Sequence, residues 1–599
     1  MRPSKLAVVL GVALVVLTVA GTRLGLAATP YVVLGAVFVT IALAAKIPER
    51  DHIVYLGSLS LSLIWMVTLL GAHVLGPDMN LEYRVSGAIM QDGWNWSGTH
   101  QYATSIVVAL LAPWLSSIPG VELLWVYKAI FPAILAIVPV VLYMVYKEVW
   151  GGERAFWSVL FFLTVPVLTL EVVGIGKMMV ACLFLALMFL VLVKAKWNIW
   201  VKGATLGVLT TLALLSHYTV GGIGLAIIGV AILSIVLMRV IGGIVSPRTD
   251  WKGAIVPLSI AALLTISVGY MYFSRIGEGR LLEFATDLVG QRTTAGASLP
   301  MLLAAFGLDI HEVPLAGKVF RIAQLLTQGM MAVGLVALWR KRREVPAEYL
   351  GCMAGGGAAL SSVLLLSHFA EAVNVTRIYF VGLFVLAPLI VLGVQMTGVH
   401  WRKLLAMLLI VYFACTSGLV FELGRSEVTS RLETPYSFAL SYERVGVIGV
   451  HDRNTLEAAR WVMLNTNTDT PVVSDALAGQ LLGSVDDNWH PSFDNPFHNR
   501  IYPKWELGTP YPQQWSLWKT PDTGSFYVFL TSWNVKHWKA VQLVPGVIDE
   551  RGYEGAYIPG MRDLRALPAN LLDNEIVYQS GKATVLLVIN SQIEKGGAK

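Results

Sequence analysis

The chain has 599 residues, of which 56% are hydrophobic and only 14% are charged, and its formal net charge is +6. Because the few charged residues are bunched between long apolar runs, the composition excludes an ordinary soluble protein and indicates a membrane protein. The positive charge comes mainly from Lys and Arg residues at the ends of the apolar runs, so we expect no nucleic-acid partner.

Apolar runs account for most of residues 1–423. Lipid offers no hydrogen-bond partner to an open backbone, so a span needs a helix of about 17 to 25 mostly apolar residues. By this rule we predict about thirteen transmembrane helices. The runs cover residues 5–20, 30–45, 53–75, 123–147, 155–172, 178–193, 203–216, 220–238, 253–273, 319–339, 349–367, 378–399 and 404–421.

Positive charges at the ends of these runs predict how the chain crosses the membrane. Short loops rich in Lys and Arg stay in the cytoplasm. No small-residue cleavage site follows the first run, so we expect a retained span and a cytoplasmic N-terminus. The loops then predicted to be cytoplasmic are 46–50, 147–154, 194–196, 239–252, 340–343 and 401–403. The pattern predicts a multi-pass protein of the cytoplasmic membrane, with residues 424–599 outside the cytoplasm.

The first of two long outside loops covers residues 76–122. Its apolar residues recur at helical spacing from Leu81 to Ile89, and Gly93 ends that segment. Residues 106–114 form a second apolar stretch that is too short to span a bilayer. We expect two helices that lie along the membrane surface.

The second long outside loop covers residues 275–318. It contains an apolar stripe between Leu281 and Leu288, a stretch of small residues at 293–298 and a further apolar piece at 301–306. This order predicts a flap in which a flexible hinge joins two surface helices.

From residue 424 to the end, the composition is that of a soluble domain. Asp452 or Asn454 is expected to cap a helix. Alternating or continuous apolar stretches predict strands at 471–475 and 525–530 and a hairpin of 575–579 with 584–590. The sequence therefore predicts a polytopic α-helical membrane domain, residues 1–423, followed by an extracytoplasmic α/β domain, residues 424–599.

Two carboxylates stand at the start of the first long loop, in the stretch GPDMNLEYRV. If this stretch is helical, Asp78 and Glu82 lie one turn apart on the same face and converge on one ligand. Partial desolvation at the membrane boundary would make such a carboxylate a better base. The structural alternative is that Asp78 caps the helix and Glu82 complements its dipole.

The combination of many spans, an acidic motif behind an early span, two surface helices, a second long outside loop and an outside α/β domain resembles the GT-C superfamily of integral-membrane glycosyltransferases. The resemblance is carried by Asp78 and Glu82 in GPDMNLEY and by the following helix, WVYKAIFPAILAIVPVVLY. It implies a GT-C-like fold and an enzyme that takes a sugar from a polyprenyl-phosphate or polyprenyl-diphosphate carrier.

The resemblance also implies roles for the two acidic residues. Asp78 corresponds to the loop aspartate that acts as general base or metal ligand, and Glu82 stands where a second acid would assist. The D-x-x-x-E spacing departs from the D-x-D or D-x-E of metal-using members, which puts a bound Mg²⁺ or Mn²⁺ in question.

A departing lipid phosphate needs cations, and Arg suits phosphate because its planar fork donates two parallel hydrogen bonds. Arg377 in NVTRIYF is the leading candidate, with Lys177 in EVVGIGKMM, the pair His217 and Tyr218 in a short turn, and Arg292 in the second long loop. Residues of these types also occur as simple interface markers at helix ends, and that alternative stays open.

The preferred hypothesis is an inverting glycosyltransferase that moves a sugar from a polyprenyl-linked carrier to a glycan, lipid or protein acceptor at the outer face of the membrane. A transporter or flippase is the main alternative, and it predicts ionisable residues within spans and broken helices. A catalytically silent membrane scaffold with the same architecture is the third.

Overall fold

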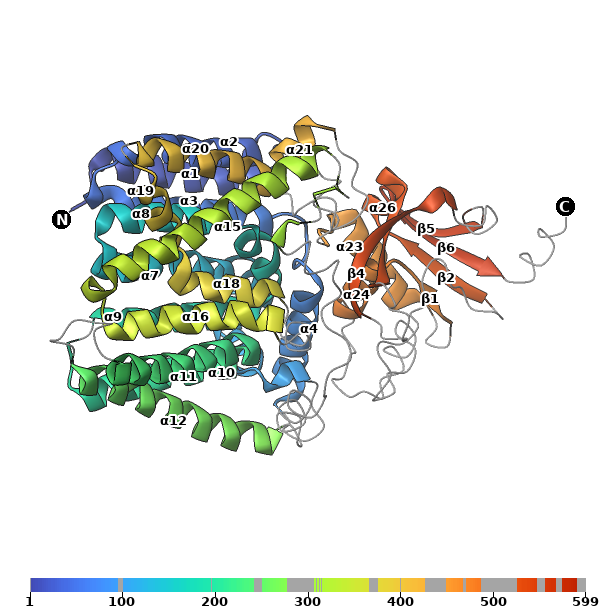
Figure 1. The fold of residues 1–599 in the computed structure, drawn as a ribbon. Coiled ribbons are helices and arrows are strands. Elements are labelled where there is room, and N and C mark those ends of the chain that lie inside the picture. The colour runs from blue at the N-terminus through green and yellow to red at the C-terminus, as the bar shows by residue number, and fades with distance from the viewer. Residues whose placement is uncertain are drawn as a thin grey trace. The chain divides into compact units, whose positions relative to one another are not determined.

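The structure is a computed structural model that describes residues 2–94, 101–194, 196–241, 250–276, 306–308, 310–311, 313, 315–365, 375–398, 400–425, 449–466, 470–485, 525–546, 555–566, 572 and 574–589. The chain forms two compact units (Figure 1). Unit 1 comprises residues 1–67, 129–426 and 435–437, and unit 2 comprises residues 68–128, 427–434 and 438–599. The first long loop therefore belongs to the same compact unit as the C-terminal domain.

Unit 1 is built of helices, most of which run alongside one another (Figure 1). They are α1 (Lys5–Arg23), α2 (Thr29–Leu43), α3 (His52–Thr68), α7 (Phe131–Trp150), α8 (Gly152–Leu163), α9 (Gly176–Lys194), α10 (Ile199–Ser216), α11 (Tyr218–Ile241), α12 (Trp251–Ile276), α15 (Leu315–Lys341), α16 (Ala347–Leu365), α18 (Val375–Leu386), α19 (Pro388–Met396), α20 (Trp401–Thr416) and α21 (Leu419–Leu423). Short helical turns are η1 (Ala44–Lys46), η2 (Glu49–Asp51), η6 (Val167–Glu171), η7 (Val172–Gly174) and η8 (Arg342–Glu344).

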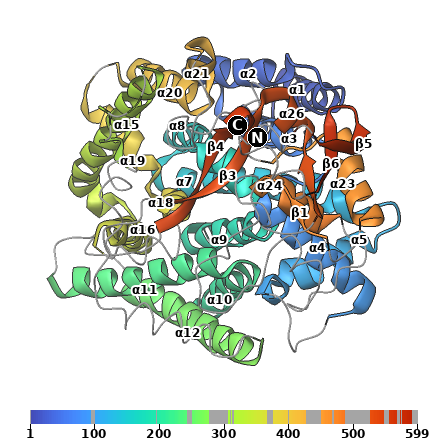
Figure 2. The same cartoon turned by 90° about the vertical axis from the view of Figure 1, so that its right-hand side faces the viewer.

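Packed helices in this unit include both consecutive pairs and pairs that are distant in the chain. Helices α10, α11 and α12 pack against one another, and α7 packs against α8 and α9 (Figure 2). Helix α15 instead packs on α19 and α20, and α11 packs on α16. Short connections explain the consecutive pairs, such as α7 with α8 and α10 with α11, because a short connection favours antiparallel packing of the helices that it joins.

Among the described residues, nine helices are long and apolar enough to span a membrane, or eleven if each of two bent pairs counts as one span. This confirms the polytopic α-helical class, although the number is below the predicted value of about thirteen. The run 404–421 is split because Gly418, with φ +83°, separates α20 from α21. The run 349–367 contains three consecutive glycines, 355–357, which dilute its apolar character.

Two predicted spans, 155–172 and 378–399, are bent rather than continuous. The segment Gly152–Leu163 meets Val167–Gly174 at 62°, and Thr376–Leu386 meets Pro388–Met396 at the same angle. A proline, Pro166 or Pro388, stands at each break; it has no N–H to donate and clashes with the preceding turn.

Helices α15 and α19 cross at two glycines. A Cβ atom on Gly334 would collide with the carbonyl oxygen of Leu389, and one on Gly393 would collide with that of Met330. Only glycine permits backbones to approach this closely, as is common where helices pack in lipid.

The predicted span 53–75 ends earlier than expected, because α3 stops at Thr68. Gly71 then adopts a positive φ of +68°, and the Ala72 N–H donates to the carbonyl oxygen of His451 at 2.8 Å. The last apolar residues of the run are therefore used in tertiary contacts of unit 2.

Unit 2 begins with the first long loop, which is helical as predicted. Helix α4 (Pro77–Asp92) ends at Gly93, whose N–H donates to Ile89 at 3.0 Å, so the predicted helix end is confirmed. The loop also contains η3 (Gln101–Thr104), η4 (Val107–Leu111) and α5 (Ala112–Ser116), and it is followed by α6 (Leu123–Trp125) and by η5 (Val126–Ile130), whose last two residues belong to unit 1. The apolar face of α4 is buried in a cluster of Val85, Ala88, Ile89, Ala103, Val108 and Ala109.

The C-terminal part of unit 2 is a mixed α/β domain. Its four-stranded sheet has the order β1-β2-β6-β5, with β1 parallel to β2 and the other pairs antiparallel. A separate two-stranded sheet joins β3 to β4. The elements are α23 (Arg453–Asn465), β1 (Val472–Val473), α24 (Ala476–Ser484), β2 (Ser525–Leu530), α26 (Ser532–His537), β3 (Lys539–Gly546), β4 (Gly555–Asp563), η9 (Leu564–Ala566), β5 (Glu575–Ser580) and β6 (Ala583–Ile589). The predicted strands and terminal hairpin are confirmed.

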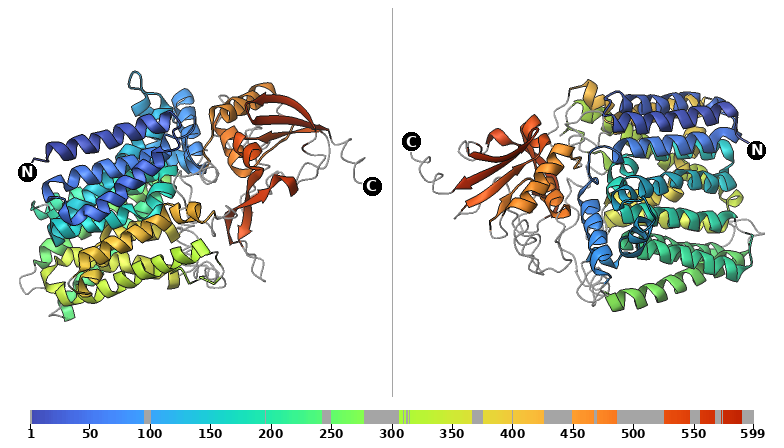
Figure 3. Two further views of the ribbon diagram at one scale, coloured as in Figure 1. Left: turned by 90° about the horizontal axis from the view of Figure 1, so that it is seen from above. Right: turned by 180° about the vertical axis from the view of Figure 1, so that it is seen from behind.

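Both faces of the four-stranded sheet are covered. Helices α23 and α24, orange in Figure 3, pack on one face around Val472, Phe529 and Val585. Phe526 and Val528, which alternate with Phe529, point into a second apolar cluster on the other face. Period-two alternation along β2 therefore serves two cores at once.

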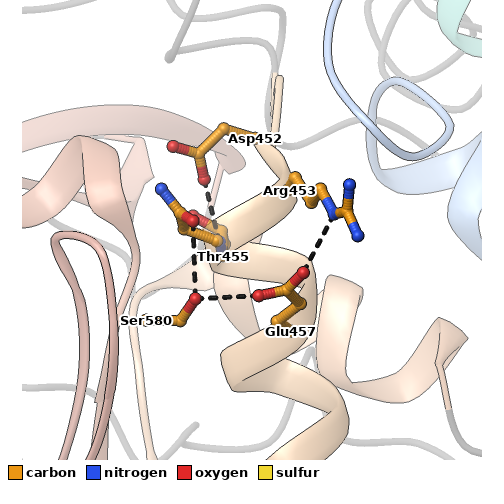
Figure 4. Close-up of polar contacts among 6 residues, drawn as sticks. Asp452, Arg453, Thr455, Glu457 and Ser580 are labelled. Atoms are coloured by element: carbon orange, nitrogen blue, oxygen red, sulfur yellow. Dashed lines mark hydrogen bonds and ion pairs between the residues drawn. The ribbon is translucent and has the colours of Figure 1, made fainter.

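Asp452 caps α23, which confirms one of the two predicted caps. Its carboxylate accepts the Thr455 N–H at 2.8 Å (Figure 4). One turn further on, Glu457 accepts hydrogen bonds from Ser580 at 3.0 Å and from Arg453 at 2.9 Å. These bonds tie the helix to the turn between β5 and β6.

Candidate functional site

Asp78 lies in the first turn of α4, immediately after Pro77. Its side chain is half-buried, and its Oδ1 atom accepts a hydrogen bond from the Tyr102 hydroxyl at 2.5 Å. The capping position belongs to Gly76, which offers no side chain, so Asp78 is not the helix cap. The carboxylate is thus held in one orientation by a residue 24 positions away.

Glu82 follows one turn later but lies in a different environment. Its side chain is fully buried, with 0% exposure, and its charge acts on the neighbouring Tyr127. Asp78 is therefore the more accessible acid of the two. Sequence reasoning correctly predicted that both side chains share α4, but it could not predict their unequal burial.

Arg377 lies in the first turns of α18, where it faces Glu171 from η6. Its Nε atom is 3.9 Å from Glu171 Oε1, and the two side chains are 19% and 10% exposed. Thr376 donates its hydroxyl hydrogen bond to the same carboxylate oxygen at 2.7 Å. This ion pair joins the two bent helix pairs of unit 1 to each other.

Lys177 and His217 are buried close to this pair. Lys177 lies in the first turn of α9, and His217 lies between α10 and α11. Burial, followed by the positive charges of Lys177 and Arg377, lowers the pKa of His217 well below its ordinary value. The imidazole is therefore neutral at physiological pH. Tyr218, 52% exposed, stacks on it with ring centroids 5.6 Å apart.

The structure thus gathers four of the predicted substrate-binding residues in unit 1: Lys177, His217, Tyr218 and Arg377. Asp78 and Glu82 belong to unit 2. Arg292 and the predicted flap, residues 281–306, lie outside the described residues except for Phe306.

Sequence reasoning missed Tyr102, which donates to Asp78, and considered Glu171 as a structural partner of Lys177 rather than of Arg377. No spacing rule links Tyr102 to Asp78, because their contact depends on how the loop folds back on α4. Glu171 carried a clear signal, since it is an acid within an otherwise apolar stretch.

Metal ligation was predicted for Asp78 and Glu82. In the part of the chain that the structure describes, no group of three or more His, Cys, Asp or Glu side chains could hold a metal ion. Asp78 and Glu82 lie one turn apart on α4 and differ in burial, since Asp78 is half-buried and Glu82 is fully buried.

A family model described as "predicted membrane protein (DUF2206)" matches residues 202–586 of this chain. None of the curated proteins matches it. Three solved structures of the Archaeoglobus fulgidus oligosaccharyltransferase are similar to it, each at 13% identity and a TM-score of 0.42.

The complex with Zn and sulfate aligns over 74% of this chain and 62% of that chain, and the apo form over 73% and 64%. The form tethered with an acceptor peptide containing the NVT sequon via a disulfide bond aligns over 75% and 64%. The chain spans less than two thirds of the length of these structures, and the oligosaccharyltransferase activity is a property of those proteins.

Proposed function

We propose that this chain, which belongs to the DUF2206 family of predicted membrane proteins, is an inverting glycosyltransferase that uses a polyprenyl-linked sugar. Asp78 is the general base, and the observation that carries the proposal is its fixed carboxylate: half-buried, at the start of a helix, and oriented by Tyr102. A base must be held within hydrogen-bond reach of the proton that it abstracts, and this arrangement supplies such a group.

The reaction requires one proton transfer and one exchange of bonds. The acceptor hydroxyl gives its proton to Asp78 while its oxygen forms a bond to the anomeric carbon of the sugar. The bond from that carbon to the carrier's phosphate oxygen breaks, and its electron pair stays on the phosphate. Attack from the face opposite the phosphate inverts the configuration.

The phosphate that departs needs a cationic environment, and Arg377 with Lys177 is proposed to supply it. Two positive side chains and one negative side chain, Glu171, give this group a formal charge of +1. Glu171, whose carboxylate accepts the hydrogen bond of the Thr376 hydroxyl, faces the guanidinium group of Arg377. The neutral His217 and the neighbouring Tyr218 lie beside these charged side chains. They are proposed to form hydrogen bonds with the substrate or to stack against it.

A divalent cation, Mg²⁺ or Mn²⁺, is proposed only at Asp78 and Glu82. Such an ion would supply positive charge to the departing phosphate. Because Glu82 is fully buried, Asp78 would be the ligand on the solvent side. Chelation followed by addition of Mg²⁺ or Mn²⁺ tests this part: restored transfer supports it, and unchanged transfer after chelation contradicts it.

The loop charges support an orientation with the N-terminus in the cytoplasm and the C-terminal α/β domain outside. The donor would then be used at the outer face of the cytoplasmic membrane, within reach of glycan, lipid or protein acceptors. Accessibility of single cysteines to a membrane-impermeant thiol reagent in intact cells tests this orientation.

The experiment that tests the activity uses purified protein in lipid nanodiscs. Tritium-labelled sugars on polyprenyl phosphate and polyprenyl diphosphate are supplied as donors, with an extract of the source membranes as acceptor. Transfer by the wild type and its loss in Asp78→Asn, by about 10²- to 10⁴-fold, are expected for a general base. Asp92→Asn, at the other end of α4, is the matched control and retains transfer. Equal activity of both variants contradicts the proposal.

A second candidate, a lipid or polysaccharide transporter or flippase, is favoured by the two bent helix pairs, since discontinuous helices often carry transport sites. It predicts that a fluorescent polyprenyl-linked sugar moves across the membrane of liposomes that contain the protein, with no cleavage of the phosphate–sugar bond. A membrane scaffold predicts neither transfer nor movement.

A further inference from the structure

The segment that connects α3 to α4 is held from one side by Lys128. This lysine is 2% exposed, and its ammonium group donates to three backbone carbonyl oxygens. They belong to Leu70 at 2.7 Å, Gly71 at 3.1 Å and His73 at 2.8 Å. An ammonium group has three protons, so these three acceptors use its full donor capacity.

The backbone of His451, which precedes α23, also contacts the segment between α3 and α4. Its carbonyl oxygen accepts the Ala72 N–H at 2.8 Å. Gly71 comes so close that a Cβ atom there would lie 2.5 Å from that oxygen, and its φ of +68° is one that glycine adopts without strain. The backbone before α4 is therefore fixed by residues that are distant in sequence.

Ser484, the last residue of α24, reaches the start of α4. Its hydroxyl oxygen lies 2.9 Å from Asn80 Oδ1, 2.9 Å from His73 Nε2 and 2.8 Å from the carbonyl oxygen of Leu481. His73, Asn80 and Ser484 are all buried. A single hydroxyl thus connects the segment before α4, the first turn of α4 and the C-terminal domain.

The hydrogen-bond donors and acceptors among His73, Asn80 and Ser484 can be assigned. The amide nitrogen of Asn80 donates to Gly76 at 2.7 Å, so Asn80 Oδ1 faces Ser484 and needs a donor. The Ser484 hydroxyl is that donor, and His73 then donates from Nε2 to the Ser484 oxygen. Burial is the main cause that lowers the pKa of His73 to about 3, so the ring is neutral and carries its one proton on Nε2.

Gly76 and Asn80 flank Asp78 in the chain, at the cap and in the first turn of α4. We propose that Ser484 is a positioning residue for Asp78: the contacts of His73, Ser484 and Asn80, which we call the α24 latch, fix the first turn of α4. The catalytic consequence rests on the proposed function, because the latch positions the base. The C-terminal domain would then be required for transfer through this contact.

Hydrogen–deuterium exchange of the whole protein in nanodiscs tests the latch without any substrate. The amides of Leu81 to Arg84 report opening of the first turn of α4. Ser484→Ala is expected to raise their exchange rates about tenfold, the size expected from loss of one buried hydrogen bond. Ser484→Thr keeps the hydroxyl and restores protection.

Ser474→Ala is the matched control in the same domain. The Ser474 hydroxyl donates to the carbonyl oxygen of Asp475 at 3.2 Å, and its removal should leave the α4 amides unchanged. Peptides from α23 and β2 show whether each variant is folded. If the α4 amides exchange equally in Ser484→Ala and Ser474→Ala, the latch is wrong.

The transfer assay gives a second reading. Ser484→Ala is expected to lower kcat about tenfold with an unchanged KM for the donor, because Asp78 acts on the acceptor hydroxyl. Ser484→Thr is expected to recover kcat. Normal kcat in a folded Ser484→Ala protein contradicts the positioning role. Absence of transfer in the wild type would contradict the proposed function. The hydrogen–deuterium exchange experiment would still test the α24 latch, because it needs no substrate.

Discussion

The Tyr102 hydroxyl donates a 2.5 Å hydrogen bond to the carboxylate of Asp78. The two residues lie on different helical segments of unit 2, and their contact orients the only half-exposed acid in the first turn of α4. Hydrogen bonds to charged groups contribute about 1.5–3 kcal/mol.

Tyr102→Phe should therefore lower kcat by about 10- to 100-fold, at about 1.4 kcal/mol per factor of ten. The measurement is sugar transfer at saturating donor, with Tyr31→Phe on the exposed part of α2 as the control. A phenylalanine variant with full kcat would show that Asp78 needs no orientation by this hydroxyl.

Arg377 is expected to bind the carrier's phosphate. Arg377→Ala removes the guanidinium group and should weaken binding of unlabelled polyprenyl phosphate about 10- to 100-fold, measured by thermophoresis in detergent. Arg402, on α20, pairs with Glu153 at 2.5 Å and is half-exposed, so Arg402→Ala is the control for loss of an ion pair. Equal Kd values for the wild type and Arg377→Ala would count against the phosphate role.

The pH dependence of stability should reveal two buried histidines in unit 2. Burial is the main cause that lowers the pKa of His73 to about 3 and of His451 to about 4. An unfolded chain takes up these protons below a pH of about 6.5, whereas the folded chain does not. Stability is therefore full above this pH and is lost as the pH falls towards 4.

Thermal unfolding followed between pH 7 and pH 4 tests this expectation. Tm should fall as the pH decreases, and His73→Gln and His451→Gln should each make the fall shallower. His400→Gln, at an exposed position, serves as the control and should leave the slope unchanged. A wild-type Tm that rises as the pH falls towards 4 would contradict the prediction.

The crossing of α15 and α19 depends on the absence of two side chains. Gly334→Ala or Gly393→Ala places a methyl group against a backbone carbonyl oxygen, and overpacking of this kind typically costs about 1–3 kcal/mol. Each variant should lower Tm. Gly329→Ala, on the same helix but with no atom within 4 Å of the added Cβ, should not.

The helices of unit 1 were largely predictable because lipid leaves an apolar run few alternatives. Helix α9 (Gly176–Lys194) lies within two residues of its predicted bounds, 178–193, at both ends. The bends were signalled by Pro166 and Pro388, but the presence of a proline in an apolar run does not determine the angle of the bend.

The site was less predictable, because its contacts are tertiary. Asp78 and Arg377 stood out by charge beside apolar runs, whereas Tyr102 had no such signal. Lys128, in WVYKAIF, carried the clearest unused signal, since a lysine near the start of an apolar run needs acceptors. Which carbonyl oxygens it would find could not be derived from spacing.

The central claim is that the carboxylate of Asp78 takes the proton of the acceptor hydroxyl during sugar transfer. The transfer rate of Asp78→Asn at saturating donor and acceptor tests it most directly, because asparagine keeps the size of this side chain and removes its basicity. Asp92→Asn, at the other end of α4, is the control.

The account predicts that Asp78→Asn loses about 10²- to 10⁴-fold in transfer rate, whereas Asp92→Asn keeps the wild-type rate. Equal rates for the wild type and a folded Asp78→Asn protein would contradict the role of Asp78 as general base.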